Sequence, residues 1–429
     1  MKQILTLLIL GQLIMATTIE YIETNGLKIP VIYEDDKRLP LATMQFIFTN
    51  AGSITDTNKA GLAKLSARVM NEGTKVLGSS AFAEELESKA IHISSSTGNE
   101  TFVMEVGSLT ENFDDALNYF DTLLKDPNIT EDSLSKVKTT TIGALSRKEN
   151  DFDYIASNEL KAALFNGSVL ANPSSGTIES IKSIELPDVK EFVEKNLVSS
   201  KLIVVLGGDI DLETTKKKIE NIIKSMYRGR KTEVKNYSVI KEPKTSILKK
   251  ETEQAYVYFG SPYNMKVDDE DYFKARVATF ILGTGGFGSR LMEEIRVKRG
   301  LAYSAYARVS VTKSSSYLTG YLQTKLESMD EAKTTVKEVV AKFVKKGVTS
   351  EELEQTKKFL LGSEPLRVET MSQRLNRTFM DYYKGHKLGY SVQELKKIEK
   401  LKLKDLNAFI KEHTEILDMS FAIVTADSK

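Results

Sequence analysis

A short segment near residue 300 contains an arginine and a tyrosine, whose side chains can both donate hydrogen bonds. Arg296 and Tyr303 stand on either side of Gly300, where a helix is expected to end. A guanidinium and a phenol aimed at a peptide carbonyl can bind it and stabilise an oxyanion, an effect worth about 2.7 to 4 kcal/mol per donor. The alternative is structural: Arg296 pairs with a carboxylate such as Glu293, and Tyr303 packs within a strand.

A glycine-rich run lies just upstream, at residues 283–288. It matches the dinucleotide-binding pattern G-x-G-x-x-G, but that pattern should follow a strand, and residues 271–282 carry apolar side chains at helical spacing. The sequence therefore does not favour a dinucleotide cofactor. A glycine stretch between two helices instead exposes backbone groups that can meet an extended peptide, whereas the simpler alternative is a linker. The candidate peptide-binding residues are Gly283, Gly285, Gly286, Phe287 and Gly288.

Other catalytic templates fail because the chain lacks their residues. It has no cysteine, which excludes disulfides, thiolate metal sites and cysteine nucleophiles. The three histidines, His92, His386 and His413, are isolated from one another, and no G-x-S-x-G motif is present. Neither a histidine-based zinc site nor a serine triad is therefore expected.

Composition and charge describe a folded chain without a bulk nucleic-acid function. The 429 residues include 60 Lys plus Arg and 59 Asp plus Glu, which gives a formal net charge of +1. A nucleic-acid-binding protein normally carries a strongly basic surface, so nucleic acid is not an expected partner. Hydrophobic residues make up 41% of the chain, enough to bury a sizeable core.

The N-terminus predicts export. Residues 1–16 begin with a short basic start and continue with an apolar run over residues 4–13, as in a signal peptide. A transmembrane span needs about 20 apolar residues, so this run is too short, and no second such segment follows. We expect an exported, periplasmic protein without a transmembrane span. The alternative is a buried N-terminal strand or helix.

The chain looks like one unit written twice. An apolar run at residues 202–206 corresponds to residues 419–423, and the preceding helical pattern recurs at the same offset of 217 residues. The matching positions are Ile181, Ile184, Asp188, Val189 and Phe192 with Ile398, Leu401, Asp405, Leu406 and Phe409. We predict two similar halves, residues 17–226 and 247–429, joined by a polar connector at residues 227–246.

Each half is expected to pack helices on a sheet. In the first half, strands are predicted at residues 17–33, 42–48 and 93–106, the last paired around a turn, and helices at residues 59–71, 80–91, 112–125 and 131–148. This alternation predicts a duplicated α/β (α+β) fold with a mixed or antiparallel sheet in each half.

Two of these segments resemble a known family. The segment 289–304, with the sequence SRLMEEIRVKRGLAYS, closely resembles the C-terminal-half signature of the insulinase/pitrilysin metallopeptidases, in their processing-peptidase branch. Residues 60–74 are similar to the inverted zinc-motif helix of that family. The resemblance covers residues 20–425 and implies a clam-shell-like chamber between the halves. It also assigns Arg296 and Tyr303 to the paired Arg and Tyr that act on the substrate.

The metal-binding residues of this family are missing. In place of H-x-x-E-H the chain has Lys64, Ala67 and Arg68, and the window 133–148, where the last glutamate ligand would fall, contains no acidic residue. Two imidazoles at i and i+4 can share a metal, whereas Lys and Arg bring two positive charges to the same helix face and repel zinc. We expect no metal and no cofactor on this chain. Lys64 and Arg68 are interpreted as a solvated basic face, with an anion site as the alternative.

The resemblance also implies a partner. Some members of the family work as two different subunits, one with the zinc helix and the other with the Arg and Tyr pair. This sequence resembles the second kind, so we expect a zinc-bearing subunit with an intact H-x-x-E-H as its partner and a peptide as the substrate. The alternative is a catalytically inactive family member with a structural, peptide-binding or assembly role.

Overall fold

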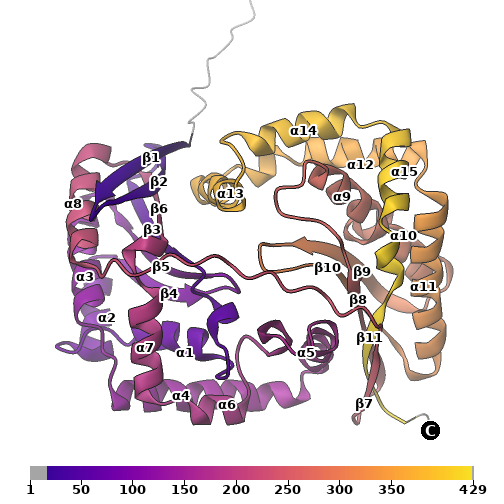
Figure 1. Cartoon of the computed structure of the whole chain (residues 1–429), viewed down its shortest axis with the longest axis horizontal. Helices are drawn as coiled ribbons and strands as arrows, with labels where there is room; N and C mark the ends of the chain where they lie inside the picture. Colours follow the sequence, from indigo (N-terminus) through magenta and orange to yellow (C-terminus); the bar gives the residue numbers. More distant parts are fainter. Residues whose placement is uncertain (1–16, 428–429) are drawn as a thin grey trace, which may run out of the picture.

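The computed structural model describes residues 17–427 as two sheets with helices packed around them. The expected signal peptide, residues 1–16, lies outside the described residues. Figure 1 shows the two halves side by side, with residues 226–244 crossing between them. The predicted duplicated α/β (α+β) architecture is confirmed.

The first half contains a sheet of six strands in the order β1-β2-β6-β3-β5-β4. Its strands are β1 (Thr18–Thr24), β2 (Leu27–Asp35), β3 (Leu41–Thr49), β4 (His92–Thr97), β5 (Thr101–Leu109) and β6 (Leu202–Gly208). Its helices are α1 (Leu62–Met70), α2 (Gly78–Ser88), α3 (Phe113–Lys125), α4 (Glu131–Arg147), α5 (Phe152–Leu164), α6 (Ile178–Ser183), α7 (Leu186–Asn196) and α8 (Leu212–Ser225).

The second half contains a sheet of five strands in the order β7-β11-β8-β10-β9. Its strands are β7 (Thr245–Lys249), β8 (Gln254–Pro262), β9 (Ala302–Val311), β10 (Ser316–Lys325) and β11 (Ser420–Thr425). Its helices are α9 (Tyr272–Thr279), α10 (Arg290–Met292), α11 (Met329–Lys346), α12 (Ser350–Gly362), α13 (Met371–Lys384), α14 (Tyr390–Lys400) and α15 (Leu403–Glu412). Two π-helical turns, Phe280–Thr284 and Glu293–Lys298, flank α10.

The two sheets follow one plan. In the first, β2 pairs with β6 in parallel, and β6-β3, β3-β5 and β5-β4 pair antiparallel. In the second, β7 pairs with β11 in parallel, and β11-β8, β8-β10 and β10-β9 pair antiparallel. Strand β1 is an additional edge strand of the first sheet. The shared order and direction are what a duplicated unit predicts.

Both sheets have strands that are buried on two faces. Every residue of β6 and of β11 is buried. Continuous apolar sequence is typical of such strands, whereas β5 alternates between buried and half-buried residues along its length. A second layer must therefore cover the face of each sheet opposite its own helices.

Each half supplies one helix to cover the sheet of the other half. Helix α5 contacts β11 and β8, and α13 contacts β2 and β6. The α5 side chains Leu160 and Leu164, with Phe165 directly after the helix, form a buried cluster with Ala422 of β11. The α13 side chains Leu375, Phe379 and Tyr383 form another with the first-sheet residues Ile32, Ile47, Ile203 and Val205. This reciprocal exchange, which the sequence analysis did not predict, fastens the halves together.

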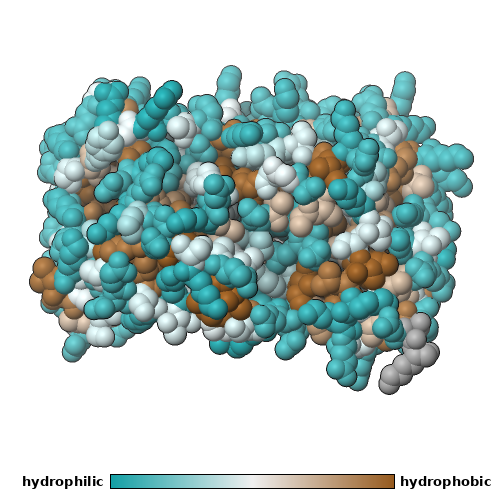
Figure 2. Space-filling view, turned by 60° about the horizontal axis from the view of Figure 1, so that its bottom comes forward, coloured by the Kyte–Doolittle hydropathy of each residue, from teal (hydrophilic) through white to brown (hydrophobic). Residues whose placement is uncertain are grey.

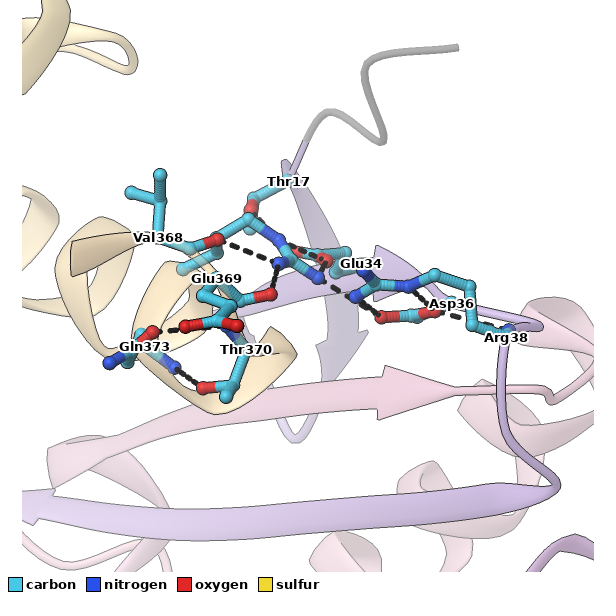
Figure 3. Close-up of polar contacts among 9 residues, drawn as sticks. Thr17, Glu34, Asp36, Arg38, Val368, Glu369, Thr370 and Gln373 are labelled. Atoms are coloured by element: carbon cyan, nitrogen blue, oxygen red, sulfur yellow. Dashed lines mark hydrogen bonds and ion pairs between the residues drawn. The ribbon is translucent and has the colours of Figure 1, made fainter. Parts of the chain in front are cut away.

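An ion-pair network secures α13 on the first sheet (Figure 3). The Arg374 Nε donates to Glu34 Oε1 at 2.7 Å, and its Nη2 donates to Asp36 Oδ2 at 3.0 Å. Arg38 also pairs with Asp36. The Arg374 Nη1 donates to the carbonyl oxygens of Val368 and Glu369, at 2.8 Å each. Because Glu34 is fully buried, its charge depends on this guanidinium.

A second polar contact between the halves lies at Glu100, which is 8% exposed. Its Oε2 accepts a hydrogen bond from the Tyr383 hydroxyl at 2.7 Å, and its Oε1 accepts one from the Ser314 backbone N–H at 2.7 Å. Glu100 precedes β5, whereas Ser314 lies in the β9-β10 hairpin. The first sheet, α13 and the second sheet therefore meet at one carboxylate.

No helix among residues 17–427 is long and apolar enough to cross a membrane. Figure 2 shows hydrophilic residues over most of one face, with hydrophobic residues gathered in separate patches.

We predict that Arg374→Met destabilises the protein by about 3 to 5 kcal/mol, because it leaves the buried Glu34 carboxylate without its cation. Chemical denaturation followed by circular dichroism measures the loss. Arg377→Met is the matched control, since Arg377 lies on the same helix but pairs with Glu364 of its own half. Equal losses in the two variants would contradict this account of the exchanged helix.

Candidate functional site

Helix α1 carries Lys64, Ala67 and Arg68, at the positions that correspond to the zinc motif of the resembled family. A buried carboxylate fixes the N-terminus of this helix. Asp56 is 2% exposed, and its two oxygens accept the backbone N–H groups of Gly61 at 2.9 Å and Ala63 at 2.8 Å. Gly61 has a φ of 90°, and a side chain there would meet the backbone N of Gly176 at 2.8 Å. The orientation of α1 is therefore fixed by a carboxylate and a close backbone contact.

The side chains of this motif do not suit a zinc ion. Lys64 Nζ donates to Ser175 Oγ at 3.0 Å, and Arg68 Nη1 donates to Thr141 Oγ1 at 2.7 Å. Ala67 between them is 2% exposed and packs in the core. Zinc requires neutral imidazoles, thiolates or carboxylates, and this face offers two cations and two hydroxyls.

Thr141 is a residue that sequence analysis did not single out. It lies on α4, inside the acid-free window 133–148, and its contact with Arg68 places it at the α1 face. The sequence indicated only that the window 133–148 lacks the glutamate ligand of the family. It gave no pattern that distinguishes Thr141 from the preceding Thr139 and Thr140.

Among residues 17–427, no three His, Cys, Asp or Glu side chains are grouped so that they could hold a metal ion. His92 is exposed on β4, and its ring nitrogen contacts Ser94 Oγ at 3.2 Å. His386 stacks on Tyr390 with ring centroids 3.7 Å apart, and His413 stacks on Tyr263 at 4.5 Å. The three histidines therefore occupy separate places.

Arg296 and Tyr303 come together in the second half. The Arg296 Cζ lies 4.1 Å from the ring centroid of Tyr303 and 4.6 Å from that of Phe287. Tyr303 is 80% exposed and Phe287 65% exposed, so two aromatic rings present a cation at the surface. We call these three residues the Arg296 stack. Cation–π contacts at exposed sites contribute about 0.5 to 1 kcal/mol, enough to orient the guanidinium but not to neutralise it.

The alternative interpretation was that Arg296 pairs with a carboxylate such as Glu293 and that Tyr303 packs within a strand, and the contacts differ from it. Glu293 and Glu294 pair with Lys298 and not with Arg296. Tyr303 points to solvent instead of packing in the core. In the described part of the chain, no carboxylate forms an ion pair with Arg296, so its charge is available to a ligand.

The elements that hold the Arg296 stack are anchored to the helices behind them. Arg290, just before the π-turn that carries Arg296, forms a two-point pair with Glu352 of α12, at 2.6 and 2.7 Å. Leu291 and Ile295 are fully buried. The stack is therefore an exposed cluster on a rigid base.

Only part of the glycine run can face a ligand. Gly283 is buried, and a side chain there would meet the backbone N of Ala307 at 2.5 Å, while one at Gly285 would meet the Phe280 carbonyl oxygen at 2.8 Å. These two glycines permit close packing. Gly286, Phe287 and Gly288 are exposed, so the predicted peptide contact is confined to them.

The α1 face and the Arg296 stack belong to different halves (Figure 1). The cavity at Lys64 is lined by first-half residues only. Among residues 17–427, no hydrogen bond or ion pair joins Arg296 or Tyr303 to Lys64 or Arg68. The chain thus carries two separate candidate sites.

The fold and these two sites define a class of two-domain, peptidase-like proteins, and comparisons with known proteins identify the family. The model of "Insulinase (Peptidase family M16)" matches residues 31–178, and that of "Peptidase M16 inactive domain" matches residues 183–360. The "Non-peptidase homolog YmxG" of Helicobacter pylori is 45% identical over 431 residues, covering 100% of both chains. An "Uncharacterized zinc protease YmxG" of Bacillus subtilis is 25% identical, covering 77% of this chain and 80% of its own. The chain belongs to the insulinase family, peptidase family M16, as the sequence analysis predicted.

Solved structures share the architecture. A "peptidase M16 inactive domain" from Pseudomonas fluorescens superimposes with a TM-score of 0.88 at 23% identity, covering 96% of this chain and 98% of its own. A protease from Helicobacter pylori superimposes with a TM-score of 0.81 at 17% identity, covering 95% of this chain and 100% of its own. At these identities the likeness establishes the fold.

We predict that the free energy of unfolding falls as pH rises from about 4 to 7, because the buried Asp56 loses its proton in this range. Burial raises the pKa of Asp56 to about 7 in the folded protein, and an unfolded Asp titrates near 3.9. A carboxyl with a raised folded pKa contributes its stabilisation below the unfolded pKa and loses it as pH rises through the folded value. A difference of about 3 pKa units corresponds to about 4 kcal/mol.

Denaturant titrations across this pH range, compared between the wild type and Asp56→Asn, measure the effect. The substitution should flatten the pH dependence. Asp211→Asn is the control, because Asp211 caps α8 and hydrogen bonds from Thr214 lower its pKa below the usual value, outside this window. A wild-type slope that persists in Asp56→Asn would show that the carboxyl does not titrate there.

Proposed function

We propose that the protein is the metal-free, peptide-binding subunit of a heteromeric insulinase-family peptidase. The main support is the Arg296 stack, in which a half-buried guanidinium lies against two exposed aromatic rings. A partner with an intact H-x-x-E-H supplies the zinc and the hydrolytic step. The chain acts after export, in the periplasm.

The Arg296 stack suits an extended peptide. The guanidinium keeps its charge and has N–H donors for a peptide carbonyl, because the rings of Phe287 and Tyr303 orient it without neutralising it. The Tyr303 hydroxyl adds a further donor. The exposed backbone at Gly286 and Gly288 can pair with the same peptide.

The α1 face supports the assignment of zinc to another chain. Lys64 and Arg68 stand where the family's histidines would be, and Ala67 replaces the general base. Purified alone, the protein is expected to hold no zinc and to cleave nothing. The name of the Helicobacter pylori relative, a non-peptidase homolog, agrees with the absence of hydrolysis.

A second candidate is a role in assembly or peptide binding without any peptidase partner. The relative's name favours this candidate as much as the first, because it excludes catalysis and specifies no complex. The two candidates differ in whether the Arg296 stack affects the turnover of a zinc-bearing partner.

We predict that Arg296→Ala weakens binding of a fluorescein-labelled casein peptide by about tenfold, equivalent to about 1.4 kcal/mol. Tyr303→Phe should have a smaller effect than Tyr303→Ala, because it removes the hydroxyl and keeps the ring that stacks on Arg296. Fluorescence anisotropy measures the affinity. Arg299→Ala is the matched control, since Arg299 pairs with Glu338 of α11 instead of joining the stack.

The same variants, added to a co-purified zinc-bearing partner, separate the two candidates. A fall in peptide turnover with Arg296→Ala and not with Arg299→Ala supports the subunit role. Unaltered turnover, together with weaker peptide binding, favours the role without catalysis. Peptide affinity that is the same in all variants would refute the proposed use of the stack.

A further inference from the structure

The α1 face opens onto a small cavity in the first half. Its volume is about 100 Å³. A water molecule occupies about 30 Å³ of liquid, so the cavity has room for about three waters or one small oxyanion. Its lining residues that carry polar side chains are Lys64, Arg68, Thr141, Lys148 and Ser175.

The charge of this lining is entirely positive. Lys64, Arg68 and Lys148 contribute three cations, and no Asp or Glu is among the lining residues. Lys64 and Arg68 come from α1, and Lys148 follows the last residue of α4. Within residues 17–427 none of the three takes part in an ion pair, and Lys148 Nζ lies 4.2 Å from the ring centroid of Tyr154.

This arrangement is unfavourable without a counter-ion. Burial lowers the pKa of Lys64, and the charges of Arg68 and Lys148 lower it further. The side chains of all three cations are half-buried, so water screens their mutual repulsion less than on an open face. A solvated basic face, the interpretation first given to Lys64 and Arg68, would leave them exposed and apart.

The two hydroxyls complete a set of donors. Ser175 Oγ accepts from Lys64 and Thr141 Oγ1 accepts from Arg68, so each hydroxyl keeps its own O–H for another acceptor. Arg68 has further N–H donors in a planar fork that suits carboxylate and phosphate oxygens. A bound anion with several oxygens would therefore satisfy donors from both α1 and the segments that face it.

We propose that this cavity binds a small oxyanion, either free phosphate or the terminal carboxylate of a peptide, between Lys64, Arg68 and Lys148. The site lies where the family motif would hold a metal cation. Its lining is positively charged, so it suits an anion instead. It is independent of the proposed peptidase partner and of the Arg296 stack.

Isothermal titration with inorganic phosphate, at constant ionic strength, tests the site. Wild-type protein should bind phosphate, and Lys64→Met and Arg68→Met should each weaken binding at least tenfold. Lys190→Met is the matched control, because Lys190 is an exposed lysine on α7 of the same half. Thermal unfolding establishes that each variant is folded.

A measurement on the wild type alone keeps the test valid if a variant fails to fold. Phosphate should protect Lys64 from acetylation by an N-hydroxysuccinimide ester, as read by peptide mass spectrometry, and should leave Lys190 unprotected. Equal modification of Lys64 with and without phosphate or peptide would overturn the proposal.

Peptide competition distinguishes the two sources of the anion. A peptide with a free C-terminal carboxylate that displaces phosphate, while its C-terminal amide does not, identifies a peptide end as the ligand. Phosphate binding that neither peptide displaces identifies the free ion. Absence of both phosphate and carboxylate binding, or binding that Lys64→Met and Arg68→Met do not weaken, would refute the site.

Discussion

The positive charge on one face of α1 is the main constraint on which ions the first half of this protein can hold. Lys64 and Arg68 lie one helical turn apart, in contact with Ser175 and Thr141. Asp56 fixes the N-terminus of the helix, and this contact holds the face that carries the two cations in its orientation. A divalent cation is repelled from such a face, and an anion is attracted to it. The same geometry supports both proposals, that zinc is held by another chain and that this face binds an oxyanion.

The exchanged helices give the two halves a fixed relationship. Because α5 covers the second sheet and α13 covers the first, neither half can bury its sheet alone. The ion pair between Glu34 and Arg374 also joins the halves, because separating it would leave a buried carboxylate without its cation. The α1 face and the Arg296 stack are therefore held on a common rigid framework, although they share no direct contact. Each half therefore presents a preformed surface to the proposed partner chain or peptide.

Much of the fold could be predicted from the sequence, because buried strands and amphipathic helices leave periodic patterns. The run at residues 202–206 became β6 (Leu202–Gly208), and its repeat became β11 (Ser420–Thr425). The segment expected as one strand at residues 17–33 is instead a hairpin, since Asn25 and Gly26 adopt positive φ in the turn between β1 and β2. The helix exchange could not be predicted, because an apolar stripe shows that a helix is buried but not which sheet buries it.

The candidate sites were predictable to the extent that a motif marks them. Arg296, Tyr303 and the altered zinc motif were identified through the resemblance of two short segments to the family, whereas Thr141, Lys148 and Ser175 join the α1 face only through folding. The most direct test of the charge inversion is the zinc content of the purified wild-type protein after incubation with zinc and gel filtration. We expect no stoichiometric metal and no cleavage of casein by the protein alone. One zinc per chain, with casein cleavage that a chelator abolishes, would contradict it.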